Sequence, residues 1–365
     1  MIYLDHGATS FPKPAAVHQA VQTALLRCAN PGRGSHPAAM AAAKVVYDCR
    51  EEAAQLFHCQ PEQVVMTSNC THGLNIAIRS LVQPGDSVVI SGFEHNAVTR
   101  PLHALGAKVT VAGRRLFDHG DTLENFEKAI KNGAKIGVFT HISNVFGYIL
   151  PIEEMAMLCR QYGIAFIVDA AQSAGCLDIN FGQLGADFVA MPGHKGLLGP
   201  QGTGLLLCRQ ATKPLLFGGT GSDSIRQEMP EYLPERLEAG TVNVPGIAGL
   251  AAGLRYVRQF GIERIFRTEQ WAAKQAAAGL KRMGMKVFDG PHQNGTVSFV
   301  PQEDCEEMGQ KLARRGIAVR AGLHCAPLAH ESAGTLQTGT LRVSFGHDAT
   351  AAQVGGFLRE MAALS

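Results

Sequence analysis

The stretch that decides the fold runs from residue 165 to residue 195 and reads AFIVDAAQSAGCLDINFGQLGADFVAMPGHK. It contains two short apolar runs, at 165–168 and 187–190, each followed by polar residues. Nearly continuous apolar runs of this length are typical of strands buried on both faces of a parallel sheet. Such sheets bind ligands at the carboxyl ends of their strands, where Asp169 and Lys195 stand in this stretch.

Similar runs occur along the rest of the first 210 residues, and helical patterns such as 151–162 separate several of them. The runs are 64–66, 87–90, 108–111, 135–140 and 204–207. This alternation predicts an α/β fold, with a mostly parallel central sheet flanked by helices on both faces.

The pattern changes after about residue 245. A long helical segment, roughly 244–283, leads to strand candidates at 296–300, 317–320 and 340–344. We therefore expect a smaller α+β C-terminal domain beside the large one. The expected division is an N-terminal arm at 1–15 associated with the small domain, a large domain at 16–250 and a small domain at 251–365.

The composition excludes several classes of protein. The chain has 365 residues, 46% of them hydrophobic, and 33 Lys and Arg against 31 Asp and Glu give a net charge of +2. So small a charge offers no field to recruit nucleic acid. No apolar run reaches the length of about 18 residues that a membrane span needs, and the start lacks the pattern of a secretory signal. Nine cysteines without CxxC pairs favour reduced thiols in a cytoplasmic protein, with neither a disulfide framework nor a structural metal site.

Lys195 and Asp169 form the strongest candidate pair. Each has an ordinary alternative when taken alone, because a lysine is usually solvated and an Asp after a strand often caps a helix. A lysine at the end of a buried strand can instead lose hydration, which makes its amine a nucleophile toward aldehydes. Pyridoxal phosphate needs such a lysine together with a carboxylate partner for its ring nitrogen.

Two further segments supply what this cofactor would need. Residues 66–73 connect a strand to a helix, and the free amides of a helix start, together with the Thr71 hydroxyl, would bind a phosphate. Ordinary capping is the alternative there, and the chain has neither a P-loop nor a GxGxxG motif. His95 also follows a strand, where its ring could stack on a planar cofactor or simply form hydrogen bonds.

Cys325 differs from the other cysteines, because it lies in a loop punctuated by Gly322 and Pro327. Arg320 and His324 are close enough in sequence to favour its thiolate. Arg342 stands inside an apolar strand, where an unpaired guanidinium would be costly. We expect a carboxylate partner for it, either an Asp or Glu of the chain or the α-carboxylate of a substrate.

Seven motifs in this order together resemble the cysteine desulfurase and selenocysteine lyase family, which is part of the class V aminotransferase group of fold-type I pyridoxal-phosphate enzymes. The resemblance extends from about residue 3 to residue 348. The motifs are YLDHGAT at 3–9, EHN at 94–96, SNVFG at 143–147, VDAAQS at 168–173, GHK at 193–195, AGT at 239–241 and RAGLHCA at 320–326.

The resemblance implies a role for each matching residue. Lys195 would carry the cofactor and move the Cα proton, Asp169 would pair with the ring nitrogen, and Cys325 would accept sulfur. The remaining implied ligands are Gln172 for the ring hydroxyl, His95 for stacking, Thr71, the His72 amide and His194 for the phosphate, Asn144 and Arg342 for the substrate carboxylate, and Thr241 for the phosphate of a neighbouring subunit.

The resemblance also implies a reaction. A homodimer would convert L-cysteine to L-alanine and leave the sulfur on Cys325 as a persulfide for an acceptor protein. Selenocysteine lyase activity on L-selenocysteine, another C–S lyase reaction and an aminotransferase reaction are the alternatives. The sequence does not identify the acceptor, the pathway or the preference between sulfur and selenium.

The sequence departs from the family pattern at three places. His6 and Gly7 replace the usual Asn-Ala at the substrate end, and His72 stands where Glu is common. Pro192 replaces a phosphate-binding Ser, and the lost hydroxyl would weaken cofactor binding by about 1 kcal/mol if nothing compensates.

Overall fold

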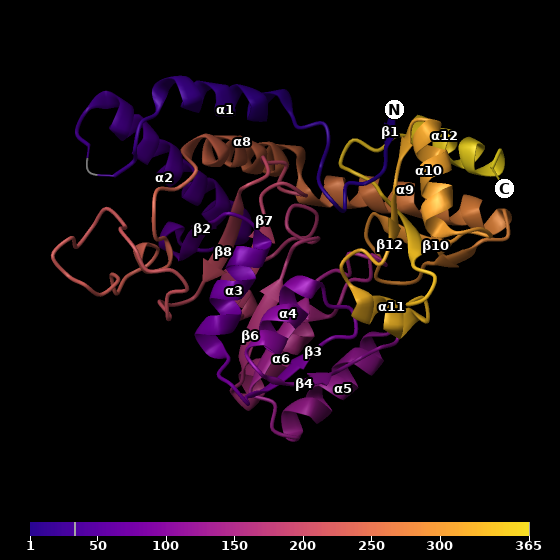
Figure 1. The fold of residues 1–365 in the computed structure, drawn as a ribbon, viewed down its shortest axis with the longest axis horizontal. Helices are drawn as coiled ribbons and strands as arrows, with labels where there is room; N and C mark the ends of the chain where they lie inside the picture. The colour runs from indigo at the N-terminus through magenta and orange to yellow at the C-terminus, as the bar shows by residue number, and fades with distance from the viewer. Residues whose placement is uncertain (33, 365) are drawn as a thin grey trace.

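A seven-stranded sheet forms the centre of the molecule (Figure 1). The computed structural model describes residues 1–32 and 34–364. The strand order is β2-β8-β7-β6-β5-β3-β4, and only β8 runs antiparallel to its neighbours among the pairings of this sheet. The strands are β2 (Val64–Thr67), β3 (Ser87–Ile90), β4 (Lys108–Val111), β5 (Ile136–Thr140), β6 (Ala165–Asp169), β7 (Phe188–Pro192) and β8 (Gly204–Cys208). The mostly parallel sheet expected from the sequence is confirmed.

Helices cover both faces of this sheet because strands buried on both sides need two apolar layers. One face packs against α3 (Cys70–Leu81) and α4 (Asn96–Ala104), through side chains such as Leu74 and Val98. The other face packs against α2 (Pro37–Phe57), α5 (His119–Lys131), α6 (Ile152–Tyr162) and α8 (Val244–Phe260). Helix α1 (Ala15–Arg27) lies on α8, and the short elements are η1 (Pro61–Gln63), α7 (Phe181–Leu184) and η2 (Glu235–Leu237).

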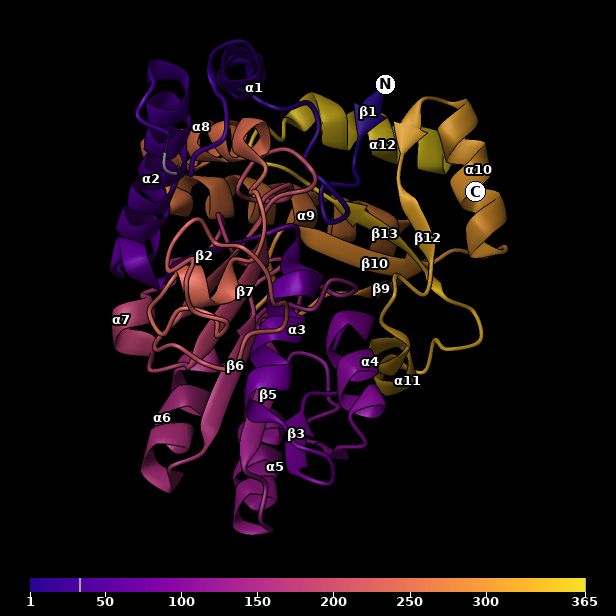
Figure 2. The ribbon, with the colours of Figure 1, turned by 60° about the vertical axis from the view of Figure 1, so that its left-hand side comes forward.

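A second sheet follows in the C-terminal part, drawn in orange and yellow in Figure 2. Its antiparallel order is β12-β13-β10-β9. The strands are β9 (Lys286–Phe288), β10 (Thr296–Val300), β12 (Arg320–Gly322) and β13 (Thr340–Ser344). Helices α9 (Ile262–Arg282), α10 (Cys305–Arg314) and α12 (Ala351–Ala362) pack a separate core with it, and α11 (Pro327–Ala333) completes the C-terminal elements.

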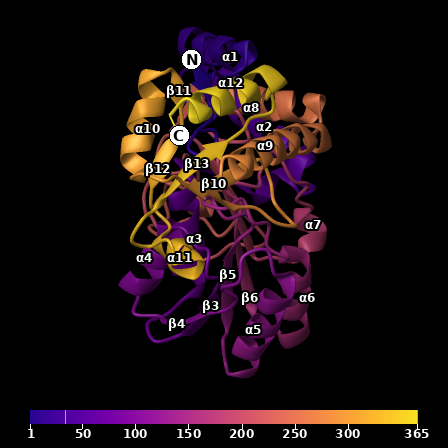
Figure 3. The ribbon, with the colours of Figure 1, turned by 90° about the vertical axis from the view of Figure 1, so that its right-hand side faces the viewer.

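The N-terminus lies against this C-terminal part (Figure 3). Strand β1 (Ile2–Tyr3) pairs in parallel with β11 (Ile317–Ala318), and a bridge joins Asp5 to Ser344 of β13. The first residues therefore reach the edge of the second sheet, which places Asp5 near strands that follow it by more than 300 positions.

Two predicted continuous segments are broken in the structure. The helical segment at 244–283 is two helices, because the chain turns at Gly261 with φ +93°, a conformation that glycine adopts without the clash of a Cβ. The strand predicted at 317–320 divides into β11 and β12, which pair with β1 and β13 respectively. In the part of the chain that the structure describes, no helix is both long and apolar enough to cross a membrane.

Candidate active site

The loops that carry Asp169 and Lys195 meet at the carboxyl edge of the large sheet. Strand β6 ends at Asp169, beside Ala190 of β7, and Lys195 follows β7 by three positions. Two glycines allow the loops to touch. A Cβ on Gly175 would lie 2.3 Å from the Gly196 carbonyl oxygen, and one on Gly196 would lie 2.4 Å from that of Ala174. The glycine after the lysine is therefore required by the close approach of these two loops.

A cavity of about 260 Å³ opens at this edge. It collects side chains from the starts of α3 and α4, the loop after β5, the end of β6 and the loop after β7. Seven of the residues predicted for the site line it, namely Thr71, His95, Asn144, Asp169, Gln172, His194 and Lys195.

The cavity makes Lys195 a better nucleophile and leaves Asp169 an available oxygen. Burial and the nearby Arg342 lower the pKa of the Lys195 ammonium, which favours the free amine. Asp169 is 2% exposed, and its Oδ1 accepts hydrogen bonds from the Ala171 amide at 2.8 Å and the Cys70 thiol at 3.5 Å. A turn and no helix follows Asp169, so the capping alternative for this residue is wrong.

His95 combines two of the interpretations offered by the sequence. It caps α4, since its Nδ1 accepts a hydrogen bond from the Ala97 amide at 3.0 Å. Burial lowers the pKa of the imidazole, so the neutral ring carries its proton on Nε2. His95 is thereby both a hydrogen-bonding cap and a ring on the wall of the cavity.

Glu94 is a functional neighbour that sequence reasoning missed. This carboxyl group is fully buried and accepts hydrogen bonds from the Ser91 hydroxyl at 2.5 Å and the Thr140 amide at 3.0 Å. It thus joins the end of β5 to the turn that precedes His95. The sequence signal was its place beside His95, which carries no information about burial.

The phosphate candidates separate into two groups. Asn69 caps α3 by accepting the His72 amide at 2.9 Å, with Thr71 on the Lys195 cavity. The His72 side chain lines a different cavity of about 230 Å³, together with Thr241. Thr241 is exposed and does not line the Lys195 cavity.

His194 and Gln172 contact the N-terminal segment. The His194 ring lies 3.1 Å from the Thr9 hydroxyl, and the Gln172 amide donates to the Gly7 carbonyl at 2.9 Å. Residues 7–9 therefore form part of the support of this site, beside the position where His6 and Gly7 depart from the family pattern.

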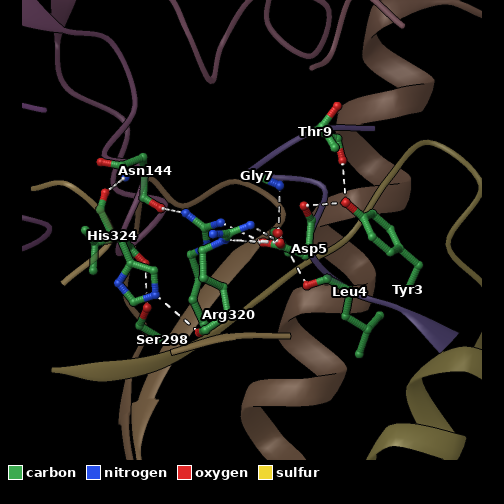
Figure 4. Close-up of polar contacts among 12 residues, drawn as sticks. Tyr3, Leu4, Asp5, Gly7, Thr9, Asn144, Ser298, Arg320 and His324 are labelled. Atoms are coloured by element: carbon green, nitrogen blue, oxygen red, sulfur yellow. Dashed lines mark hydrogen bonds and ion pairs between the residues drawn. The ribbon is translucent and has the colours of Figure 1, made fainter. Parts of the chain in front are cut away.

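Asp5 supplies the carboxylate that we expected for Arg342 (Figure 4). Its Oδ1 accepts from Nη2 of Arg342 at 2.8 Å, and its Oδ2 accepts from Nη2 of Arg320 at the same distance. Arg342 also donates to the Asn144 carbonyl at 2.8 Å, while its Nε is buried with no partner in the described chain. Of the two alternatives, a side chain of this protein holds Arg342.

Cys325 is the exposed cysteine of the chain, whereas six of the others are buried and two are half-buried. Its carbonyl accepts from the Asn96 amide at 2.8 Å, which fixes its backbone beside His95. The Asn144 amide donates to the carbonyl of His324 at 2.8 Å. These two bonds bring the Cys325 loop to the side of the Lys195 cavity. The described residues contain no group of three or more potential metal ligands.

Comparison with known proteins identifies the family. The family model described as aminotransferase class-V matches residues 2–357. The chain belongs to this family. Among class-V aminotransferase relatives, it is 35% identical to a probable cysteine desulfurase of Pyrococcus abyssi, over 89% of this chain and 85% of that protein. A probable cysteine desulfurase of Methanothermobacter thermautotrophicus is 31% identical, over 100% of this chain and 95% of that protein.

Solved structures agree with this assignment. The apo cysteine desulfurase of Thermococcus onnurineus superposes with a TM-score of 0.92 and 34% identity, over 100% of this chain and 94% of that one. The fold is therefore that of the fold-type I members of the class-V aminotransferase family, as expected from the resemblance.

Proposed function

We propose that this class-V aminotransferase family member is a pyridoxal-phosphate-dependent cysteine desulfurase, which converts L-cysteine to L-alanine and leaves sulfur on Cys325. The names of its relatives support this reaction. The structural observation that supports it most directly is the hydrogen bond from the Asn96 amide to the Cys325 carbonyl. That bond places the backbone of the exposed thiol beside the cavity of Lys195 and Asp169.

The residues of the cavity fit pyridoxal phosphate. Lys195 has its pKa lowered by burial, and Asp169 uses Oδ1 for the Ala171 amide and the Cys70 thiol, which leaves Oδ2 for a ring nitrogen. His95 would stack on the ring, Gln172 would donate to its hydroxyl, and Thr71, the His72 amide and His194 would hold the phosphate. When bound, the cofactor supplies an aldehyde for covalent attachment and a protonated ring that withdraws electrons from the substrate Cα.

The chain's own residues then divide the reaction between them. Arg342 and Asn144 hold the α-carboxylate of L-cysteine, and Lys195 removes the Cα proton at Nζ. The Cys325 thiolate attacks the substrate sulfur and forms an S–S bond while the C–S bond breaks. The electron pair of the broken bond stays on the carbon skeleton, which takes up protons to become L-alanine.

Product analysis tests this proposal. Purified protein with pyridoxal phosphate, L-cysteine and a thiol reductant should release alanine and sulfide in equal amounts. Lys195→Ala should lower turnover by at least about 1,000-fold, because the amine that moves the proton is lost. Cys325→Ser should abolish persulfide formation, and Cys59→Ser, at a half-buried thiol outside the site, is the matched control. No alanine from the wild-type protein would refute the proposal.

Selenocysteine lyase activity remains the second candidate for this site. Comparison of Cys325→Ser on L-cysteine and on L-selenocysteine separates the two reactions. Loss on cysteine alone indicates that the site performs both, whereas no loss on either substrate indicates that Cys325 has no role.

We further propose a homodimer in which Thr241 reaches the phosphate of the neighbouring subunit, since Thr241 is exposed and separate from its own Lys195 cavity. A groove of about 800 Å³, also lined by Thr241, runs between α2 and the segment 219–242. Transfer of the persulfide sulfur to an acceptor protein and a cytoplasmic location complete the proposal.

A further inference from the structure

Three buried side chains behind the Cys325 loop form a continuous row of hydrogen bonds. Thr335 lies 2.8 Å from Nδ1 of His330, and Nε2 of His330 lies 3.3 Å from Nδ1 of His324. Nε2 of His324 ends the row, 3.2 Å from the Arg320 carbonyl. His330 is 0% exposed, and Thr335 is 1% exposed. The sequence analysis considered His324 and His330 only for metal binding and for an effect on the thiol.

The direction of every proton in the row follows from its last acceptor. A carbonyl only accepts, so His324 carries its proton on Nε2 and presents a lone pair at Nδ1. His330 must then donate from Nε2, and its Nδ1 must accept the Thr335 hydroxyl proton. Burial lowers the pKa of His324 to about 3 and that of His330 to about 4, so both rings stay neutral. The arrangement is therefore single and directed at ordinary pH.

The row connects the two ends of the segment that carries the thiol. Arg320 belongs to β12, and Thr335 follows α11, with Cys325 between them. His324 and Cys325 have φ values of +52° and +56°, a left-handed conformation that is unfavourable for residues with a Cβ. Such a conformation persists only where surrounding contacts hold it.

The other side of the segment is attached to the large sheet. The Asn96 amide donates to the Cys325 carbonyl, and the Ser332 hydroxyl donates to the Gly92 carbonyl at 2.8 Å. The ring of His330 also lies 5.9 Å from that of Phe146. The thiol segment thus lies between the large domain on one side and the histidine row on the other.

We propose that the row Thr335–His330–His324 is a positioning element that holds the Cys325 loop in its left-handed conformation for sulfur transfer. The inference rests on the proposed function, in which the Cys325 thiolate must meet the substrate sulfur. His330 and Thr335 act through His324 and touch neither substrate nor cofactor in this proposal.

Thr335 offers the sharpest test, because valine has its shape without the hydroxyl. Thr335→Val removes the donor that fixes the His330 tautomer, and Thr335→Ser restores it. In cofactor-free protein, hydrogen exchange of the peptide spanning 320–330 should accelerate at least 10-fold in Thr335→Val and return to the wild-type rate in Thr335→Ser. Exchange of a peptide within α9 should remain unchanged, which excludes general unfolding.

Turnover supplies the second readout. Thr335→Val should lower kcat for alanine formation at least 10-fold, with KM for L-cysteine and cofactor affinity within twofold of wild type. Wild-type exchange and wild-type kcat in a folded Thr335→Val would overturn the proposal. If that variant does not fold, Thr335→Ala replaces it under the same criteria. The exchange result needs no turnover, so a wild-type protein that makes no alanine refutes the proposed function without deciding the role of the row.

Discussion

Asp5 is the single residue that neutralises two arginine side chains of the candidate site. Arg342 is 2% exposed and Arg320 is half-exposed, and both donate to the Asp5 carboxylate. Removing one partner of a buried ion pair leaves the other charge without compensation. The interaction is thus more important for the integrity of the site than an exposed pair of the same length.

Asp5→Asn should therefore lower the free energy of unfolding by about 3 kcal/mol, mainly through Arg342. Urea unfolding of the cofactor-free protein measures this loss. Asp48→Asn removes an exposed partner of Lys44 in α2 and should cause no measurable change. Equal effects of the two substitutions would show that Asp5 does not compensate a buried charge.

Glu94 predicts a pH dependence of stability. Burial raises the pKa of Glu94 to about 8 from an ordinary value of 4.5. The folded state then binds this proton more tightly than the unfolded state. The stabilising contribution is complete below about pH 4.5 and is lost as the pH rises toward 8.

Glu94→Gln should flatten the decline of the unfolding free energy between pH 5 and 8. The difference between wild type and variant should reach a slope of up to about 1.4 kcal/mol per pH unit. The comparison cancels the buried histidines, whose lowered pKa values act in the opposite direction and are present in both proteins. Parallel curves for the two proteins would contradict this prediction.

Residue types and their positions predicted Lys195, Asp169 and the exposed Cys325 because each follows or interrupts a recognisable pattern. Asp5 could not be predicted as the partner of Arg342 in the same way. The two side chains are separated by 337 positions, and pairing of Asp5 with Arg342 depends on how β1 and β13 come together. The sequence supplied only the requirement that some carboxylate satisfy Arg342.

Helix α3 is the element that presents backbone amides to the phosphate end of the cavity. Its cap is the side chain of Asn69, which accepts the His72 amide. An N-cap of this kind stabilises a protein by about 1 kcal/mol relative to alanine. The same helix end favours an anion through its macrodipole.

Two substitutions at Asn69 should separate these roles. Asn69→Ala should lower the unfolding free energy by about 1 kcal/mol, whereas Asn69→Asp preserves the cap and should keep it. Asn69→Asp nevertheless places a negative charge at the phosphate end, so pyridoxal phosphate should bind more weakly than to the wild type. Unfolding curves and a cofactor titration followed by absorbance measure the two effects. Unchanged cofactor affinity in Asn69→Asp would place the phosphate elsewhere.

Element types were predicted where hydrophobic periodicity was strong, and errors arose where tertiary pairing decides. The apolar pattern of residues 317–320 is that of one strand, yet Val319 is where the chain passes from β1 to β13 as partner. Helices α8 and α9 have continuous helical composition on both sides of Gly261. A single glycine was insufficient to predict the break from sequence.

The whole molecule depends on its N-terminal segment to join the second sheet. Pairing of β1 with β11 supports the expected association of residues 1–15 with the C-terminal part. We propose the division into domains at residue 250 on the same basis, since α9 packs with the core of the second sheet and α8 with that of the first. Composition and spacing predicted two cores but could not predict which one the N-terminus joins.

The proposed sharing of Thr241 between subunits predicts complementation between two inactive variants. Lys195→Ala lacks the reactive amine but keeps Thr241, and Thr241→Glu keeps Lys195 but places a carboxylate where a phosphate of the partner would bind. In a mixed dimer, the intact Lys195 receives an intact Thr241 from the other subunit. Random exchange in a two-fold dimer should restore about a quarter of the sites.

The experiment mixes the two purified variants under conditions that allow subunits to exchange and follows alanine formation. Each variant alone should be almost inactive, and the mixture should recover about a quarter of wild-type activity per site. A mixture of Lys195→Ala with Cys59→Ser is the control for activity that exchange alone leaves in the intact subunit. If Thr241 instead serves its own chain, the mixed dimer contains no complete site and the mixture stays inactive, because no subunit then combines Lys195 with a working Thr241.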